Sequence, residues 1–230
     1  MSDTDSFIDE VTEEVRRDRL FGYFKKYGWI AVVLVVAIVG GTAYNEWSKA
    51  QARAKAQNAG DAILGALEAN APADRIAALD KVKSGDITPG ARAIVALLEA
   101  AEQSADGDDA AAQAALDLIA SDGSLPEIYR QIAAFKSASR KGSLSADERR
   151  QRLSALASPG QALRPLAQEQ LALIDIEEGN TEAAIETLQG LVVDAEATAG
   201  LRQRATQLII ALGVEPETLA GQDAQAASSQ

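Results

Sequence analysis

The chain of 230 residues contains one long apolar stretch, Trp29-Ile30-Ala31-Val32-Val33-Leu34-Val35-Val36-Ala37-Ile38-Val39-Gly40-Gly41-Thr42-Ala43-Tyr44. None of these residues is charged, and eight of them are Val, Ile or Leu. A core helix of a soluble protein carries a polar residue at every third or fourth position, and this run does not. From Trp29 to Trp47 a helix would span roughly 27 Å, close to the thickness of a hydrocarbon core. The stretch therefore predicts a single transmembrane helix over residues 28–45.

The flanks of the run support this prediction and indicate an orientation. Aromatic rings, which favour the level of the lipid headgroups, stand at both ends. Five basic residues lie within about 15 residues before the run and three within a similar distance after it. Because basic flanks stay on the cytoplasmic side of a membrane, residues 1–27 are expected to form a cytosolic amphipathic segment. The rest of the chain is expected to be exported.

A cleavable signal peptide is the alternative reading of this segment. Small residues with the spacing that a signal peptidase recognises follow the run, at Ala50, Ala52 and Ala54. However, residues 1–27 precede the predicted span, and these candidate sites lie well beyond its end. The flanks therefore favour an uncleaved signal anchor.

Composition limits the fold class of the exported part and the ligands and chemistry expected of it. Aromatic residues make up only 4% of the chain, and no run of alternating Val, Ile and Thr follows the span, so an all-α fold is expected. The net charge of -12 disfavours nucleic acid and anionic lipid as ligands. The chain has no Cys and no His, which excludes thiol chemistry, disulfides and the usual zinc ligands.

Helix-breaking residues divide the exported part at regular intervals. Gly107, Gly142 and Gly179 lie 35 and 37 residues apart, a period typical of two-helix repeats in an α-solenoid. Capping hydroxyls are predicted at Thr88, Ser124 and Ser145. The expected helices pair as 46–69 with 73–84, 90–105 with 108–120, 126–140 with 146–157, and 163–178 with 181–194, followed by 199–212. Residues 46–213 form the predicted helical domain and 214–230 a disordered tail.

One segment, residues 171–188 (LALIDIEEGNTEAAIETL), resembles the middle of a tetratricopeptide repeat. The resemblance implies that Ala172 packs under a partner helix, that Gly179 and Asn180 make the turn, and that Ala184 lies at the closest helix contact. A second copy of the turn is found at residues 107–112. The repeat-start Trp and the repeat-end Pro of the family are missing. The expected fold is thus a single transmembrane helix followed by a degenerate tetratricopeptide-like α-solenoid.

The layout of the whole chain is similar to that of the ancillary subunit of the Sec translocon. Residues 6–19 (SFIDEVTEEVRRDR) and the Tyr27-Gly28-Trp29 motif look like the start of that family in Gram-negative bacteria. The resemblance implies a bacterial inner-membrane protein with a cytoplasmic N-terminus and a periplasmic C-terminal domain. It also implies association with Sec translocon subunits and with periplasmic chaperones or client proteins. The alternative is a structural tether or assembly factor for another envelope complex, such as the division or respiratory apparatus.

No catalytic constellation is predicted. The only crowded nucleophile candidate is Ser137-Ala138-Ser139 beside Lys136 and Lys141, and a polar helix end accounts for it as well. The acidic turn at residues 106–109 lacks the pattern of a calcium loop and is interpreted as a helix N-terminus. We therefore expect no enzyme activity, no cofactor, no metal and no small-molecule substrate.

A solenoid binds its partners on a concave face lined by the first helix of each pair. The repeat register places seven candidate binding residues on this face: Tyr129, Ile132, Lys136, Leu166, Glu169, Leu173 and Ile176. The alternative is that the Leu and Ile residues among them pack between helices.

Overall fold

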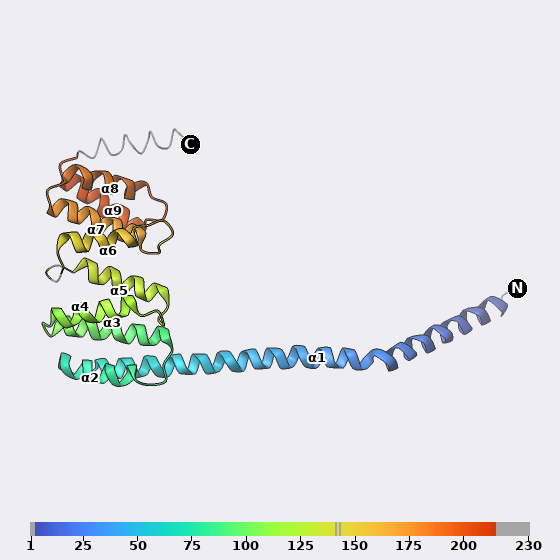
Figure 1. Cartoon of the computed structure of the whole chain (residues 1–230). Helices are drawn as coiled ribbons and strands as arrows, with labels where there is room; N and C mark the ends of the chain where they lie inside the picture. The colour runs from blue at the N-terminus through green and yellow to red at the C-terminus, as the bar shows by residue number, and fades with distance from the viewer. Residues whose placement is uncertain (1–2, 141, 143, 215–230) are drawn as a thin grey trace. The chain divides into compact units, whose positions relative to one another are not determined.

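The computed structural model describes residues 3–140, 142 and 144–214, and the side chains within these ranges except those of 3–25, 27, 28 and 31. This part of the chain forms nine α-helices and no strand, which confirms the all-α fold (Figure 1). The chain divides into two compact units, residues 1–57 and 58–230. The helices are α1 (Asp3–Leu67), α2 (Pro72–Lys83), α3 (Pro89–Ala105), α4 (Asp109–Ser121), α5 (Glu127–Ser139), α6 (Ala146–Leu156), α7 (Arg164–Glu177), α8 (Thr181–Val193) and α9 (Ala199–Ala211).

The first unit consists of the greater part of α1. Every described side chain of the run from Trp29 to Tyr44 is exposed, and the large apolar and aromatic ones expose 44–70% of their area. Within the described residues, no helix is both long enough and apolar enough to cross a membrane. Ala31 of the predicted span lies outside the described side chains, as does most of the predicted cytosolic segment 1–27. Of the predicted tail, only Val214 is described.

The helices of the second unit begin and end within two residues of the predicted bounds. Thr88 and Ser145 cap α3 and α6 as predicted, and Ser145 forms a reciprocal capping box with Glu148. The prediction of a cap at Ser124 is wrong. Pro126 occupies the N-cap position of α5, and the Ser124 amide instead donates to a carboxylate oxygen of Asp122 over 2.9 Å. Ser124 lies two residues before this N-cap, and no side chain caps the start of α5.

Two of the predicted breaks share one turn geometry. Gly107 and Gly179 have φ angles of +87° and +79°, which glycine adopts without the steric penalty of a side chain. In each turn the amide of the residue after glycine donates to the backbone carbonyl of the residue five positions earlier. The Asp108 amide donates to the Gln103 carbonyl over 2.9 Å, and the Asn180 amide donates to the Asp175 carbonyl over 2.8 Å. This is the Schellman pattern, which satisfies carbonyls that a helix end leaves unpaired.

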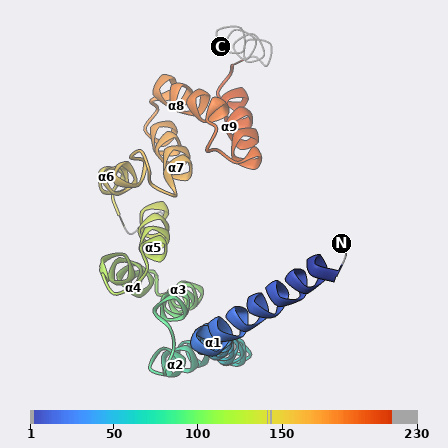
Figure 2. The same ribbon diagram turned by 90° about the vertical axis from the view of Figure 1, so that its right-hand side faces the viewer.

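The helices of the second unit stack in chain order, each from α2 onward packing against the next. Figure 2 shows α4 and α6 on one side of the stack and α3, α5 and α7 on the other. The buried apolar residues form four clusters instead of one core, each built from neighbouring helices. Ala172 and Ala184, predicted to lie at close helix contacts, are both fully buried in the last cluster. Small side chains at these positions let α7 and α8 approach closely.

Ion pairs link helices of the stack, some of them consecutive and some separated by one helix. They join residues 16 to 35 positions apart, as in the pairs Arg75–Glu102, Lys83–Glu99, Arg150–Asp175, Arg164–Asp194 and Arg204–Glu169. Most involve arginine, whose planar guanidinium can hold a carboxylate and a second acceptor together. Arg75, for example, also donates to the carbonyls of Ala69 and Asn70 over 3.0 Å. The pairs thus fix how one helix lies against the next.

Candidate functional site

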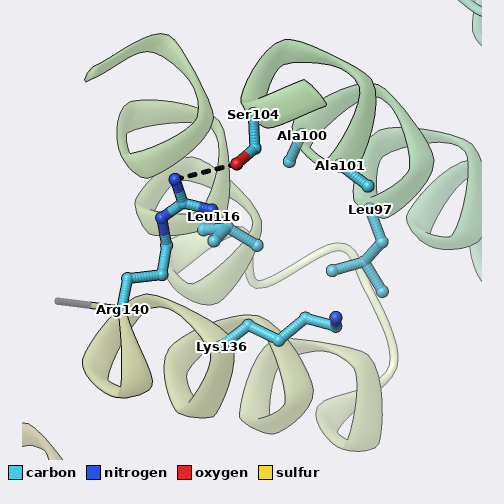
Figure 3. A pocket seen from close by; sticks show the side chains of 7 residues that line it. All are labelled: Leu97, Ala100, Ala101, Ser104, Leu116, Lys136 and Arg140. Carbon is cyan, nitrogen blue, oxygen red and sulfur yellow. Dashed lines mark hydrogen bonds between the residues drawn. The ribbon is translucent and has the colours of Figure 1, made fainter. Parts of the chain in front are cut away.

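A pocket of about 260 Å³ opens between α3 and α5 (Figure 3). α3 contributes Ser104 and three apolar side chains, and α4 contributes one leucine to the apolar part. One cation comes from α5 and the other from the residue that follows its last residue. The apolar side chains are Leu97, Ala100, Ala101 and Leu116, and the cations are Lys136 and Arg140. The pocket therefore joins an apolar surface to two positive charges in a chain whose net charge is -12.

The two cations of the pocket have different surroundings. Arg140 forms an ion pair with Asp109, and its Nη2 also donates to the hydroxyl of Ser104 over 3.1 Å. Ser104 in turn donates to the Asp109 carboxylate over 3.1 Å, so that the ends of α3 and α5 and the start of α4 meet at this cluster. Lys136, by contrast, is exposed and makes no hydrogen bond or ion pair with any residue described. Its ammonium lies apart from the Arg140 guanidinium in Figure 3.

A second pocket, of about 200 Å³, lies between α2, α3 and α4. Its lining contains two cations and two carboxylates, Lys83, Arg92, Glu99 and Asp122, so its charges balance. Lys83 and Glu99 form an ion pair of 2.5 Å. Burial lowers the pKa of Lys83, but its hydrogen bonds to Glu99 and Asp80 outweigh this effect and raise the pKa above its usual value. The remaining lining is mainly apolar.

Ser137 and three polar partners form a network between α4, α5 and α6. Ser137 is fully buried; its hydroxyl donates to Asp117 over 2.7 Å and accepts from Gln113 and Arg152 over 2.5 and 2.7 Å. Arg152 also pairs with Asp117 over 2.5 Å. The hydroxyl that the sequence singled out as a nucleophile candidate is therefore enclosed and fully hydrogen-bonded. The second candidate, Ser139, has a buried hydroxyl without a partner among the described residues.

The Asp117 carboxylate makes this network sensitive to acid. Burial raises its pKa, but hydrogen bonds from Ser137, Arg152 and Gln113 outweigh burial and lower the pKa below the ordinary value of 3.8. A carboxyl whose pKa is lower in the folded chain stabilises the fold above its unfolded-state pKa. That stabilisation is lost as the pH falls through the folded-state pKa.

We expect Asp117→Asn to lower the free energy of unfolding at neutral pH, because it removes the ion pair with Arg152. The pair is partly exposed and solvent screens it, so the expected loss is only about 1 kcal/mol. The difference from the unmodified chain should shrink as the pH falls from about 5 to about 2, where the carboxyl of the unmodified chain is also neutral. Urea denaturation followed by circular dichroism at each pH measures both quantities. Asp61→Asn, at an exposed position of α1, is the control. A difference that stays constant across this range would contradict the assignment.

The seven residues predicted for the concave face do not all line one cavity. Lys136 lines the pocket described above. Glu169 is buried at 6% exposure and binds Arg204 through both carboxylate oxygens, at 2.8 and 2.9 Å. The other five are partly buried: Tyr129, Ile132, Leu166, Leu173 and Ile176. Of these, Tyr129, Leu166 and Ile176 pack against the buried clusters. The alternative reading concerned only the Leu and Ile residues, and Leu166 and Ile176 agree with it.

The sequence did not predict that Ser104, Asp109 and Arg140 form one group. Arg140 follows Lys136 by four residues, a spacing that places two side chains on one face of a helix and its end, and this was a usable signal. Nothing comparable in the sequence relates Asp109 to Arg140, since the two are 31 residues apart. Asp108 caps α4 by accepting from the Ala111 amide over 2.9 Å, so the acidic turn at 106–109 serves as a helix N-terminus.

No protein-family model, curated protein or solved structure matches this chain.

Proposed function

We propose that this protein is a non-enzymatic interaction scaffold, anchored in the bacterial inner membrane, that associates with the Sec export channel and with periplasmic folding factors or newly exported clients. One observation carries the proposal: the apolar run of α1 exposes large side chains at consecutive positions from Val32 to Val36. Consecutive positions cover every face of a helix. A helix that is apolar on all faces is stable only when it is surrounded by lipid or by protein.

The helical array supplies the binding part of the scaffold. In the proposal, residues 58–213 form a tetratricopeptide-like solenoid. The period of about 36 residues, the stacking of each helix on the next and the buried Ala172 and Ala184 support this reading. Solenoids of this kind act by presenting an extended surface to protein partners. The pocket between α3 and α5 is lined mainly by residues of these two helices, which are the first helices of two predicted pairs.

The assignment to the export channel depends on the resemblance of the sequence to the ancillary translocon subunit. That resemblance comprises the N-terminal motif at residues 6–19, the aromatic entry to the apolar run, and the order of anchor and array. A uniformly acidic exported domain also fits protein partners with basic patches better than it fits nucleic acid.

Crosslinking tests the proposal at the anchor. A photoreactive amino acid is placed at Val33 or Ile38, both exposed on α1, and the crosslinked partners are identified by mass spectrometry. Subunits of the Sec channel are expected. The same group at Leu118, which is 71% exposed on α4, is the control and should not yield the membrane subunits. Recovery of only unrelated complexes would overturn the translocon assignment, and enrichment of division or respiratory proteins would favour the structural tether instead.

A further inference from the structure

The exposed surface of α4 differs from that of the other second helices of the predicted pairs. After Asp109, the exposed residues of α4 are Ala110, Ala114, Leu118 and Ser121, and none of them is charged. The helices α2, α6 and α8 expose charged side chains, among them Asp74 and Asp80, Asp147 and Glu148, and Glu182 and Glu186, respectively. A surface helix ordinarily places charged and polar residues on its solvent side. The uncharged surface of α4 therefore suits contact with another apolar surface.

Leu118 is the largest side chain on this surface of α4. It exposes 71% of its area, more than any other large apolar side chain described. It also lines the pocket of about 200 Å³ between α2, α3 and α4, together with four further apolar side chains, Ala96, Ala115, Ile119 and Leu125. A single exposed leucine needs no explanation. Here, however, a protruding apolar side chain lies beside an apolar hollow, so a surface of the same kind can cover one and fill the other.

The charges around this pocket restrict its partner. The lining contains two cations, Lys83 and Arg92, and two carboxylates, Glu99 and Asp122, so its net charge is zero. The whole chain has a net charge of -12, which attracts basic partners and repels other copies of the chain. A basic partner gains no attraction from a neutral pocket. For two copies, in contrast, a neutral and apolar surface is where like charges oppose contact least.

We propose that the surface of α4 around Leu118 binds the same surface of a second copy of this chain. In a twofold-symmetric contact both copies use the same patch, which must therefore be complementary to itself. A twofold axis beside Leu118 places this side chain of each copy in the pocket of the other, so both leucines are covered and both hollows are filled. The short side chains of Ala110 and Ala114 let the two α4 helices approach closely.

The contact is smaller than the interface of a stable dimer in solution. Stable interfaces bury about 1,200–2,000 Å² in total, and one leucine, its pocket and two alanines from each copy supply only part of that area. The proposed membrane anchor offsets this deficit, because two chains held in one membrane by the same end meet at a raised effective concentration. In this respect the inference rests on the proposed function, to which it adds a partner and the surface that binds it.

Single cysteines test the contact, since the chain has none of its own. Ala114→Cys lies one helical turn from Leu118, and a bismaleimide crosslinker with a span of about 11 Å reaches across two such turns. Treatment of cells that produce this variant of the full chain should give a covalent dimer, seen by immunoblotting after denaturing electrophoresis. Ser154→Cys, at an exposed position of α6, is the matched control and should give none.

A second substitution assigns the contact to Leu118. In the Ala114→Cys chain, Leu118→Glu should lower the yield of dimer at least about tenfold, because it places a charge in an apolar pocket and brings two like charges together. Val193→Glu adds the same charge at an apolar side chain of α8 that is 65% exposed and lies outside the pocket, and it should leave the yield unchanged. Both positions are exposed, so neither change should disturb the fold.

Several results would overturn the inference. One is the absence of a dimer from Ala114→Cys, and another is an equal yield from Ser154→Cys. A yield that Leu118→Glu leaves unchanged would show that the copies meet elsewhere, for example along α1. Adducts of Ala114→Cys with a different protein, without a dimer, would show that another partner occupies the surface.

The outcomes also separate this inference from the proposed function. If no dimer forms but crosslinks from Val33 reach the Sec channel, the inference fails and the scaffold assignment stands. If the dimer forms as expected but the crosslinks from Val33 reach only unrelated complexes, the α4 contact stands and the translocon assignment fails.

Discussion

Replacing Val35 and Val36 with arginine is expected to release the chain from the membrane fraction. Both valines lie in the middle of the apolar run, and more than half of each side chain is exposed on α1. On insertion scales a central arginine is less favourable than valine by about 3 kcal/mol, so two substitutions amount to about 6 kcal/mol. That difference corresponds to a factor of about 10⁴ in partitioning between membrane and water.

Fractionation of cells by centrifugation, followed by immunoblotting of the pellet and the supernatant, measures this effect. Two controls are available in the same chain. Val35→Leu with Val36→Leu keeps the run apolar and should leave the protein in the pellet. Leu64→Arg with Leu118→Arg adds the same charge at positions exposed by 63% and 71% outside the run, and should also leave it there. If the variant with arginine at positions 35 and 36 stays in the pellet and resists alkaline extraction, the anchor prediction is wrong.

Leu153→Ala is expected to lower the free energy of unfolding by about 2–5 kcal/mol. Leu153 on α6 is fully buried in the cluster that it forms with Ala138 of α5 and Ala167 and Ile174 of α7. Truncation removes apolar contacts and leaves a cavity that stacked helices close only in part. Leu118→Ala makes the same chemical change at a side chain that is 71% exposed, and should change the stability by no more than about 0.5 kcal/mol.

Chemical denaturation followed by circular dichroism gives the stability of both variants. Hydrogen exchange shows which helices lose protection of their backbone amides. In a stack where each helix packs mainly on its neighbours, the amides of α5, α6 and α7 should lose protection first, and those of α9 last. Equal destabilisation by the two variants would contradict the assignment of Leu153 to a core.

The sequence determined the helices of this protein because their signals are local. Gly107 and Gly179 end helices through a backbone conformation that glycine adopts easily, and the hydroxyls of Thr88 and Ser145 cap amides within the next turn. Such contacts span only a few residues, so the order of residue types is enough to place them. Ser124 misled the prediction because a hydroxyl near a proline is compatible with more than one turn.

The tertiary structure alone decided which side chains meet across the stack. Glu169 was expected on an open face, yet it is buried against Arg204, 35 residues further along the chain. Ser137 was expected at a polar helix end, yet Gln113 and Arg152 enclose it from two other helices. These outcomes depend on the rotation of each helix about its axis and on how closely it approaches its neighbour. Both are set by the packing of many distant side chains at once, and no local pattern in the sequence encodes them.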